Sequence, residues 1–373
     1  MSRFGKRADM VVHEREPYNA EPPRAALAQG ALTPRDTFYV RGHGPVPEGD
    51  EHDWQIELDG LLEHPLVVTL AELRSGRWPH HELIATLQCA GNRRRDLAAV
   101  RPIPGEAPWG PGATGTARWG GVALSDVLAL AQPRAEATHV AFVGADVSPE
   151  ADPPQLYGAS IPLAKALHGE VLLTYEMDDE ALPTVHGGPL RVVVPGYIGA
   201  RSVKWLTRIE LRSSPWPGYF QSTAYRLLAP DESPGPGQGM ELGEVALNGD
   251  FLSPADGAQL APGTIPLAGY AFAGGAREVA RVEVSADGGR HWVQARLGGD
   301  QGPWAWRQWQ AEIDLSPGEH ELVARAWDTS ANTQPERPET VWNPKGYVNT
   351  SWARIRVRVS GATAAGAASA SGS

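Results

Sequence analysis

Hydrophobic and polar positions follow an irregular mixed pattern over the first part of the chain. Short apolar runs at 139–144, 171–176 and 190–194 alternate with short helical patterns and glycine-rich turns, and residues 203–212 predict a further strand. Strand-like and helix-like periods therefore occur together, but without the regular spacing of βαβ units. This combination predicts a mixed α+β fold.

Beyond about residue 241 the pattern consists of strands alone. Residues 277–297 predict a hairpin that turns at Asp287-Gly288-Gly289, because apolar positions alternate on both sides of a glycine turn. Residues 319–327 predict another strand, and residues 354–359 alternate strictly between arginine and an apolar side chain. Such a run of strands predicts a β-sandwich of immunoglobulin type, although without the cysteine pair of that fold.

Segments rich in proline, glycine and serine divide the chain. Proline punctuates the N-terminal arm and the linker, whereas small residues dominate the C-terminal tail. The predicted parts are an extended N-terminal arm (1–35), a mixed domain (36–213), a linker (214–240), a β-domain (241–359) and a disordered tail (360–373).

The composition excludes several classes of protein. The chain has 373 residues with 42 Gly and 33 Pro, which argues against a helical bundle. Its single cysteine excludes an intramolecular disulfide, a Cys-x-x-Cys zinc site and an iron–sulfur cluster. The net charge of −11 argues against nucleic acid and anionic membranes as partners, and no apolar run is long enough to span a bilayer. The N-terminus lacks the apolar segment of a secretion signal, so we expect a cytoplasmic protein.

Two familiar motifs lack the context that their chemistry needs. Residues 110–115 match the dinucleotide fingerprint G-x-G-x-x-G, but they follow a proline-rich segment where a buried strand is required. Residues 186–189 contain the letters of the cytochrome b5 haem loop in the wrong order. Neither a dinucleotide nor a bound haem is therefore expected.

The lone cysteine has an unusual setting. Cys89 lies in the segment ATLQCAGNRRR, between an apolar approach and three arginines. One interpretation is a small buried hydrophobic residue. The other is a thiolate favoured by guanidinium groups, which suits a soft or high-valent metal. One thiolate cannot hold a metal unaided, so the other ligands would come from a cofactor or from distant side chains.

Basic residues also cluster in two other segments. Residues 186–206 place His186, Arg191, Arg201 and Lys204 around glycine turns and a buried-looking strand, which suits a phosphorylated heteroaromatic ligand. The alternative is a solvated basic face. Residues 37–47 (TFYVRGHGPVP) place arginine and histidine two positions apart, on one side of an extended strand.

Five segments together resemble the sulfite oxidase family of molybdenum–pterin enzymes. They are ATLQCAGNRR, FYVRGHGPVP, YGASIP, HGGPLRVVVPGYIGARSVKW and WNPKGYVNTSWARIRV, and they occur in the family's order. The segment VVHEREPYNAEPPRAAL is similar to the plant-type members, which have no haem domain. The resemblance runs from about residue 11 to residue 359.

The resemblance implies a role for particular residues. In that family a cysteine thiolate binds molybdenum beside the dithiolene of one molybdopterin, and Cys89 matches that position. The implied cofactor contacts are Tyr39, Val40, Arg41, Gly42, His43, Asp146, His186, Arg191, Ser202, Val203 and Lys204. The implied substrate pocket consists of Arg41, Arg94, Trp109, Tyr225 and Arg354. Two features depart from the family: Gly42 stands where an asparagine is usual, and a few extra residues follow Asp146.

The implied activity is oxidation of sulfite to sulfate by oxygen-atom transfer. Electrons would pass to an external acceptor, either oxygen or a cytochrome, since no fused haem is expected. Three pocket arginines would concentrate positive potential on a small anion despite the negative net charge. The C-terminal region resembles the family's dimerisation domain, which implies a homodimer.

Three other functions stay open on the sequence. A nitrate reductase also uses a cysteine-bound molybdenum but needs no third pocket arginine, so Arg354 favours sulfite. Another oxyanion or sulfur compound could be the substrate instead. A non-catalytic module that binds pterin or an anion is the alternative from a different class. Methionine-sulfoxide reductases of this superfamily lack the β-domain, which argues against them.

Overall fold

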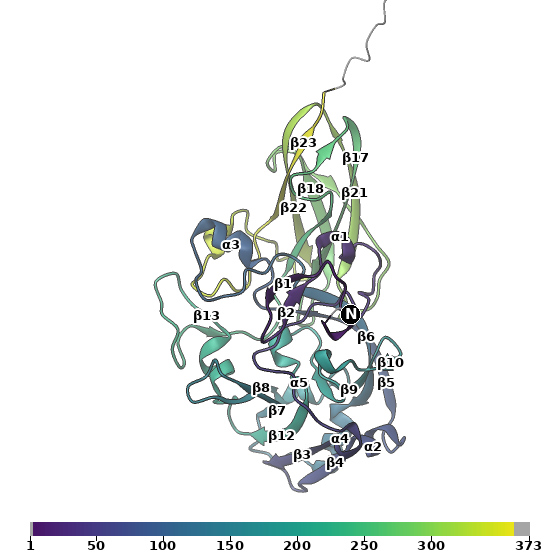
Figure 1. Ribbon diagram of the computed structural model, residues 1–373, viewed down its shortest axis with the longest axis vertical. Helices are drawn as coiled ribbons and strands as arrows, with labels where there is room; N and C mark the ends of the chain where they lie inside the picture. The colour runs from purple at the N-terminus through teal and green to yellow at the C-terminus, as the bar shows by residue number, and fades with distance from the viewer. Residues whose placement is uncertain (1–2, 362–373) are drawn as a thin grey trace, which may run out of the picture.

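The computed structural model describes residues 3–361 and has two regions stacked along its longest axis (Figure 1). The first region combines mixed sheets with short helices, and the second is a sandwich of strands. This confirms the predicted α+β fold followed by an immunoglobulin-like all-β region. The predicted tail, 360–373, lies outside the described residues apart from its first two positions. None of the described helices is long and apolar enough to cross a membrane.

Two five-stranded sheets form the first region. One has the order β10-β9-β6-β5, with β11 also paired to β9. The other has the order β4-β3-β12-β7-β8, in which β12 runs parallel to β3 and antiparallel to β7. The strands are β3 Gln55–Gly60, β4 Leu66–Thr69, β5 His80–Gln88, β6 Thr114–Ala123, β7 His139–Ser148, β8 Gln155–Pro162, β9 Leu172–Met177, β10 Glu180–Ala181, β11 Arg191–Val193 and β12 Leu206–Arg212.

Short helices connect these strands and cover the core. They are α2 Leu70–Arg74, α3 Arg94–Val100, α4 Leu124–Ala131 and α5 Leu163–Ala166. Helix α4 buries the apolar side chains that recur at helical spacing, Leu124, Val127, Leu128 and Ala131. Helix α2 begins at a capping box, in which Thr69 and Glu72 satisfy each other's free backbone N–H groups. Sequence-local signals therefore account for α2 and α4.

The N-terminal arm is folded against the first region. It contains β1 Val11–Glu14, β2 Asn19–Glu21 and α1 Arg24–Leu27. Ala20 and Val40 exchange backbone hydrogen bonds of 3.0 and 2.8 Å, and the Asn19 side-chain oxygen accepts from the Gly42 N–H at 2.7 Å. The arm therefore holds the segment that contains the predicted contacts from Tyr39 to His43.

The predicted linker contains more structure than a connector. A π-helical turn, Phe220–Ala224, is followed by β13 Arg226–Leu227, which pairs with β14 Met240–Glu241. Phe220 and Tyr225 are buried in the core of the first region. Aromatic residues that the proline-rich composition obscured thus anchor the first half of this segment.

The second region is a two-sheet sandwich. Its sheets have the orders β15-β17-β21-β20 and β16-β23-β22-β18-β19. The predicted hairpin is confirmed, because Val284 of β18 faces Val293 of β19. The strands are β15 Asn248–Ser253, β16 Gln259–Leu260, β17 Gly263–Phe272, β18 Val279–Ser285, β19 Val293–Gln294, β20 Arg296–Leu297, β21 Arg307–Leu315, β22 Gly318–Asp328 and β23 Ala353–Val359. Ile355, Val357 and Val359 of β23 point into the core, as their alternation predicts.

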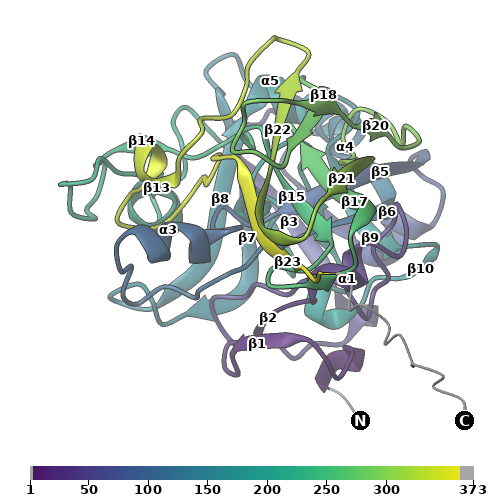
Figure 2. The same cartoon turned by 90° about the horizontal axis from the view of Figure 1, so that it is seen from above.

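The two regions meet around the turn that begins α3. The segment between β22 and β23 leaves the sandwich and lies beside α3 in both views (Figures 1 and 2). The buried Arg93 guanidinium donates to the carbonyl oxygens of Gly249 and Ser351, and its Nε lies 3.1 Å from the Asp250 carboxylate. The sandwich therefore contacts the run of arginines that follows Cys89.

Candidate active site

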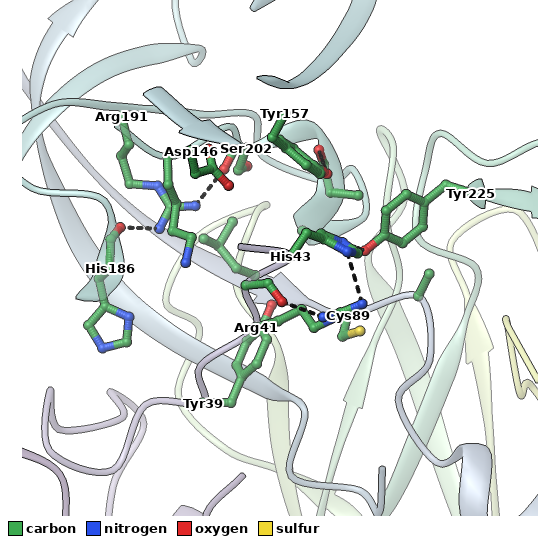
Figure 3. Close-up of a pocket in the computed structure, with 16 residues that line it drawn as sticks. Tyr39, Arg41, His43, Cys89, Asp146, Tyr157, His186, Arg191, Ser202 and Tyr225 are labelled. Atoms are coloured by element: carbon green, nitrogen blue, oxygen red, sulfur yellow. Dashed lines mark hydrogen bonds between the residues drawn. The ribbon is translucent and has the colours of Figure 1, made fainter. Parts of the chain in front are cut away.

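A cavity opens in the first region where several distant segments converge. It encloses about 640 Å³ of empty space, a volume that includes solvent at its open mouth. Figure 3 shows that basic and aromatic side chains from these segments point into the same space. The predicted residues that line it are Tyr39, Arg41, Gly42, His43, Cys89, Asp146, His186, Arg191, Ser202, Lys204 and Tyr225.

Cys89 stands at the end of β5, in a turn that leads to α3. Its backbone N–H donates to the Ala113 carbonyl at 2.9 Å, and its sulfur accepts from the Gly91 N–H at 3.4 Å. Burial raises the pKa of the thiol, while the charges of Arg94 and Arg41 act in the opposite direction. The expected guanidinium effect is therefore present, but burial outweighs it until a cation is bound.

A wall of buried cations lines the same cavity as the cysteine, on the side away from it (Figure 3). The Arg191 guanidinium donates to the carbonyl oxygens of His186 and Ser202, both at 2.7 Å. Burial lowers the pKa of Arg191 to about 10 and the pKa of Lys204 to about 7. These cations are held by backbone carbonyl groups and are poorly solvated, which is the environment that an anionic ligand would stabilise.

Asp146 is the acidic member of this wall. Burial raises its pKa to about 6. Its Oδ1 atom is buried and has no hydrogen-bond partner. Because buried polar atoms in folded proteins are nearly always satisfied, this oxygen is placed to accept a hydrogen bond from a ligand in the cavity.

The backbone also leaves room for a ligand. A Cβ atom added to Gly187 would lie 2.9 Å from the Lys204 side chain, and one added to Gly199 would lie 2.8 Å from the Tyr39 hydroxyl. Glycine at these positions lets basic and phenolic groups approach the cavity wall closely. Larger residues would displace the groups that line the site.

The N-terminal arm supports this wall from outside. Lys6 is buried, and its ammonium group donates to the Phe38 carbonyl at 2.8 Å and lies 2.6 Å from His186 Nε2. Burial lowers the pKa of Lys6 to about 7. The arm was predicted to be extended, but its contact with His186 was not anticipated, since no local pattern singles out one lysine.

A second cluster occupies the opposite side of the cavity. His43 Nε2 lies 2.7 Å from the Tyr225 hydroxyl, and His43 Nδ1 lies 2.6 Å from Glu150 Oε1. Arg41 lies 3.6 Å from the same carboxylate. Tyr157 lines the cavity and stacks on His43, with ring centroids 5.2 Å apart. Tyr157 is within the segment YGASIP, so a signal for it existed in the sequence.

Four predicted residues lie behind the cavity wall. Val40 and Val203 are buried, and their chain neighbours line the site instead. Arg94 is held behind Cys89, where it donates to the carbonyl oxygens of Lys345 and Ala107 at 2.8 Å. Trp109 is fully buried and packs in the same cluster as Cys89.

The predicted pocket residue Arg354 is not brought to the cavity. It lies on β23, where it donates to Glu321 at 2.9 Å and to the Glu336 carbonyl at 3.0 Å. The alternation of β23 turns its arginines to the outer face of the sandwich, and Arg354 is not among the residues that line the cavity. This corrects the sequence expectation of a third pocket arginine from this strand.

Lys345, from the loop that precedes β23, lies closer to the cavity residues than Arg354 does. Lys345 pairs with Glu106, which also pairs with Arg94 at 3.2 Å. Its charge also helps to lower the pKa of Glu150. Lys345 lies in the segment WNPKGYVN, which the resemblance included, but sequence alone did not favour it over Arg354.

The donor set fits a molybdenum–pterin cofactor. Among residues 3–361, no group of three or more His, Cys, Asp or Glu side chains is arranged to hold a metal ion. A metal at Cys89 would thus take its other ligands from an organic carrier. The buried cations and the unpaired Asp146 oxygen suit the anionic and hydrogen-bonding groups of such a carrier.

Comparisons with known proteins agree with this arrangement. Residues 43–220 match the family "Oxidoreductase molybdopterin binding domain", and residues 244–360 match "Mo-co oxidoreductase dimerisation domain". The chain is 43% identical over 360 residues to sulfite oxidase of Gallus gallus, covering 92% of this chain and 76% of that protein. It is 40% identical over 375 residues to sulfite oxidase of Arabidopsis thaliana, covering 94% of each. The sulfane dehydrogenase SoxCD of Paracoccus pantotrophus has a similar structure, with a TM-score of 0.80, 27% identity and coverage of 93% and 86%.

Proposed function

The chain belongs to the sulfite oxidase family of molybdopterin oxidoreductases, and from this membership we propose that it oxidises sulfite to sulfate and passes two electrons to an external acceptor. The observation that carries the proposal is one cavity in which a lone thiol, Cys89, faces buried cations and an arginine–histidine–tyrosine cluster. A small dianion is the substrate that such a cavity favours.

The cofactor would be held by two groups of residues. Cys89 would bind the metal, while Arg191, Lys204, His186 and the Asp146 carboxylate would hold the organic part. When bound, the molybdenum cofactor supplies two-electron redox chemistry and oxygen-atom transfer. The chain's own residues then have to place the anion, keep bulk water out and manage the protons.

Arg41 and Tyr225 are the residues that would contact substrate. Arg41 lines the cavity, and its charge is balanced on the far side by Glu150 at 3.6 Å. This leaves the guanidinium able to donate hydrogen bonds to an anion. Burial raises the pKa of Tyr225 further above its usual value, so the phenol stays protonated and can donate or accept a hydrogen bond.

Three further features complete the proposal. The match to a dimerisation domain supports a homodimer. The electron acceptor is oxygen or a cytochrome, and the chain works in the cytoplasm without a haem of its own.

With Arg354 outside the cavity, the argument that disfavoured nitrate as a substrate is lost. Nitrate therefore stays the second candidate substrate.

The test combines metal analysis with side-by-side assays. Purified protein should contain stoichiometric molybdenum and oxidise sulfite with oxygen, ferricyanide or cytochrome c as acceptor. Nitrate reduction is measured in parallel with a reduced dye. The Cys89→Ser variant should lose sulfite-dependent activity. Full activity in that variant, or nitrate turnover without sulfite oxidation, would overturn the proposal.

A further inference from the structure

The turn between β7 and β8 packs against the segment that carries His43. Ser148, the last residue of β7, donates through its hydroxyl to the His43 carbonyl at 3.0 Å and accepts from the Glu150 N–H at 3.2 Å. A Cβ atom on Gly44 would come within 2.1 Å of the Val147 carbonyl oxygen. The hairpin and the segment that carries His43 are thus in direct backbone contact, and this contact brings Glu150 next to His43.

The hydrogen bonds around His43 define its tautomer. Glu150 Oε1 lies 2.6 Å from Nδ1. Burial alone would raise the pKa of Glu150, but His43, Arg41 and Lys345 lower it to about 2, so the carboxylate is ionised and can only accept. Nδ1 must therefore carry the proton of the neutral ring. Arg41 Nη2 lies 3.1 Å from the same nitrogen, but it cannot donate to an N–H, and its charge faces the carboxylate instead.

The second ring nitrogen, Nε2, determines how the Tyr225 hydroxyl is oriented. With the proton on Nδ1, Nε2 is an acceptor, and the Tyr225 hydroxyl at 2.7 Å donates to it. The remaining lone pair of the phenol oxygen is then free to accept from a molecule in the cavity. Figure 3 shows the Tyr225 hydroxyl directed at the His43 ring.

We propose that Glu150 is a positioning residue that fixes His43 as the Nδ1–H tautomer, so that Tyr225 and His43 together take up a proton released in the cavity. The proposal rests on the proposed function, because sulfite oxidation consumes water and yields two electrons, which go to the external acceptor, and two protons. In the step described, the phenol oxygen takes one of these two protons while the phenol proton passes to Nε2, and the other proton leaves to bulk water. Tyr225 ends neutral, His43 becomes an imidazolium, and Glu150 is its counter-ion. The net charge of His43 and Glu150 together changes from −1 to 0.

The charges around His43 explain why the ring needs Glu150 in order to accept a proton. Burial lowers the pKa of His43 to about 4, and Arg41 on the same segment and Lys204 before β12 lower it in the same direction. Glu150 is the group that raises it. Tyr225 and the rings of Tyr157 and Phe220 occupy the remaining contacts. Because the Glu150 side chain is 40% exposed, the imidazolium lies one residue away from bulk solvent.

The experiment compares two substitutions in the same turn. Glu150→Gln keeps the shape and removes the charge, and Asp152→Asn removes an exposed charge two positions along the hairpin turn. In protein labelled with ¹⁵N-histidine, wild type and Asp152→Asn should show His43 with a protonated Nδ1 and an unprotonated Nε2. Glu150→Gln should lose this preference. The His43 signal is assigned by its loss in a His43→Asn variant.

Kinetics then test the proton role. For Glu150→Gln we expect kcat/KM for sulfite to fall by about tenfold to a hundredfold, with the acidic limb of the pH profile displaced to lower pH. A purely structural loss would lower activity without displacing that limb. A wild-type His43 protonated on Nε2, or equal behaviour of the two variants, would overturn the inference.

The two proposals fail in different ways. If the protein does not oxidise sulfite but the NMR signals of the two variants differ as described, the substrate is wrong and the positioning of His43 by Glu150 stands. If sulfite is oxidised and Glu150→Gln matches Asp152→Asn in both measurements, the substrate stands and the positioning role is wrong.

Discussion

Arginine side chains lie in two contrasting environments in the molecule. In the first region, Arg191 is buried and donates to backbone carbonyl groups beside the cavity. On the sandwich, Arg354 and Arg358 lie on the outer face of β23 and pair with Glu321 and Glu319. A guanidinium held inside by neutral oxygens is poised for an anion, whereas one paired in solvent is already compensated.

This contrast teaches that burial and pairing, more than charge itself, mark a ligand site. The chain carries −11 overall, yet its cavity is lined by cations whose pKa values burial depresses. The sandwich has its own cavity-like depressions, but the residues around them are mostly exposed and of mixed charge. Substitutions should therefore have large effects in the first region and small ones on the outer face of the sandwich.

The largest effect should come from the junction between the regions. Arg93→Met removes the guanidinium that pairs with the buried Asp250 at 3.1 Å and bonds three backbone carbonyls of the sandwich side. Leaving a buried carboxylate with one weaker partner costs about 3–5 kcal/mol. Urea unfolding should show this loss. The double variant Arg93→Met/Asp250→Asn should recover part of it; no recovery would mean that the ion pair is not the source.

A smaller effect, on kcat/KM for sulfite, should distinguish the cavity arginine Arg41 from the surface arginine Arg354. Arg41→Met should lower kcat/KM for sulfite by about tenfold to a hundredfold, because one charge-assisted hydrogen bond contributes about 1.5–3 kcal/mol. Arg354→Met, which removes the same group from β23, should stay within about twofold, because it makes no contact at the cavity. Steady-state kinetics at fixed acceptor concentration measures both. An equal loss in the two variants would place Arg354 in the pocket after all.

The sequence predicted what local patterns encode. The alternation of Ile355, Val357 and Val359 correctly predicted the buried face of β23, and the glycine turn correctly predicted the hairpin of β18 and β19. The quoted segments also contain most of the residues that line the cavity. The strand face and the hairpin depend on residues close together in the chain, so a short window is enough to detect them, whereas the cavity residues were implied by the family resemblance.

The sequence could not determine which of several equivalent cations would face the cavity. In the run of arginines after Cys89, Arg93 takes a left-handed conformation with φ of 62° and reaches the sandwich, Arg94 turns behind the cysteine, and Arg95 is largely exposed. Glu150 is likewise brought to His43 by the pairing of β7 with β8. Such placements depend on long-range packing, which no local pattern reports.

The N-terminal arm offers a test by pH. Burial lowers the folded-state pKa of Lys6 to about 7, below its unfolded value of about 10.5. The unfolded state thus binds more protons between these values, and the free energy of unfolding should rise as pH increases from 7 to 9. Lys6→Met should remove about 1–2 kcal/mol of that rise. Lys165→Met, at a lysine paired with Glu170 at 2.7 Å, is the matched control and should keep the wild-type slope.

The smallest effect should come from the sandwich itself. Arg325 lies over the rings of Trp292 and Trp327, 3.8 and 4.5 Å from their centroids, and pairs with Glu283 at 2.9 Å. It is among the better-packed arginines of this surface, and yet its partners remain partly in solvent, so Arg325→Met should cost only about 0.5–1 kcal/mol. Arg325→Lys should recover little, since a lysine keeps the charge but not the planar group that stacks between the indoles. Urea midpoints for both variants measure this, and a loss as large as that of Arg93→Met would remove the distinction between the two regions.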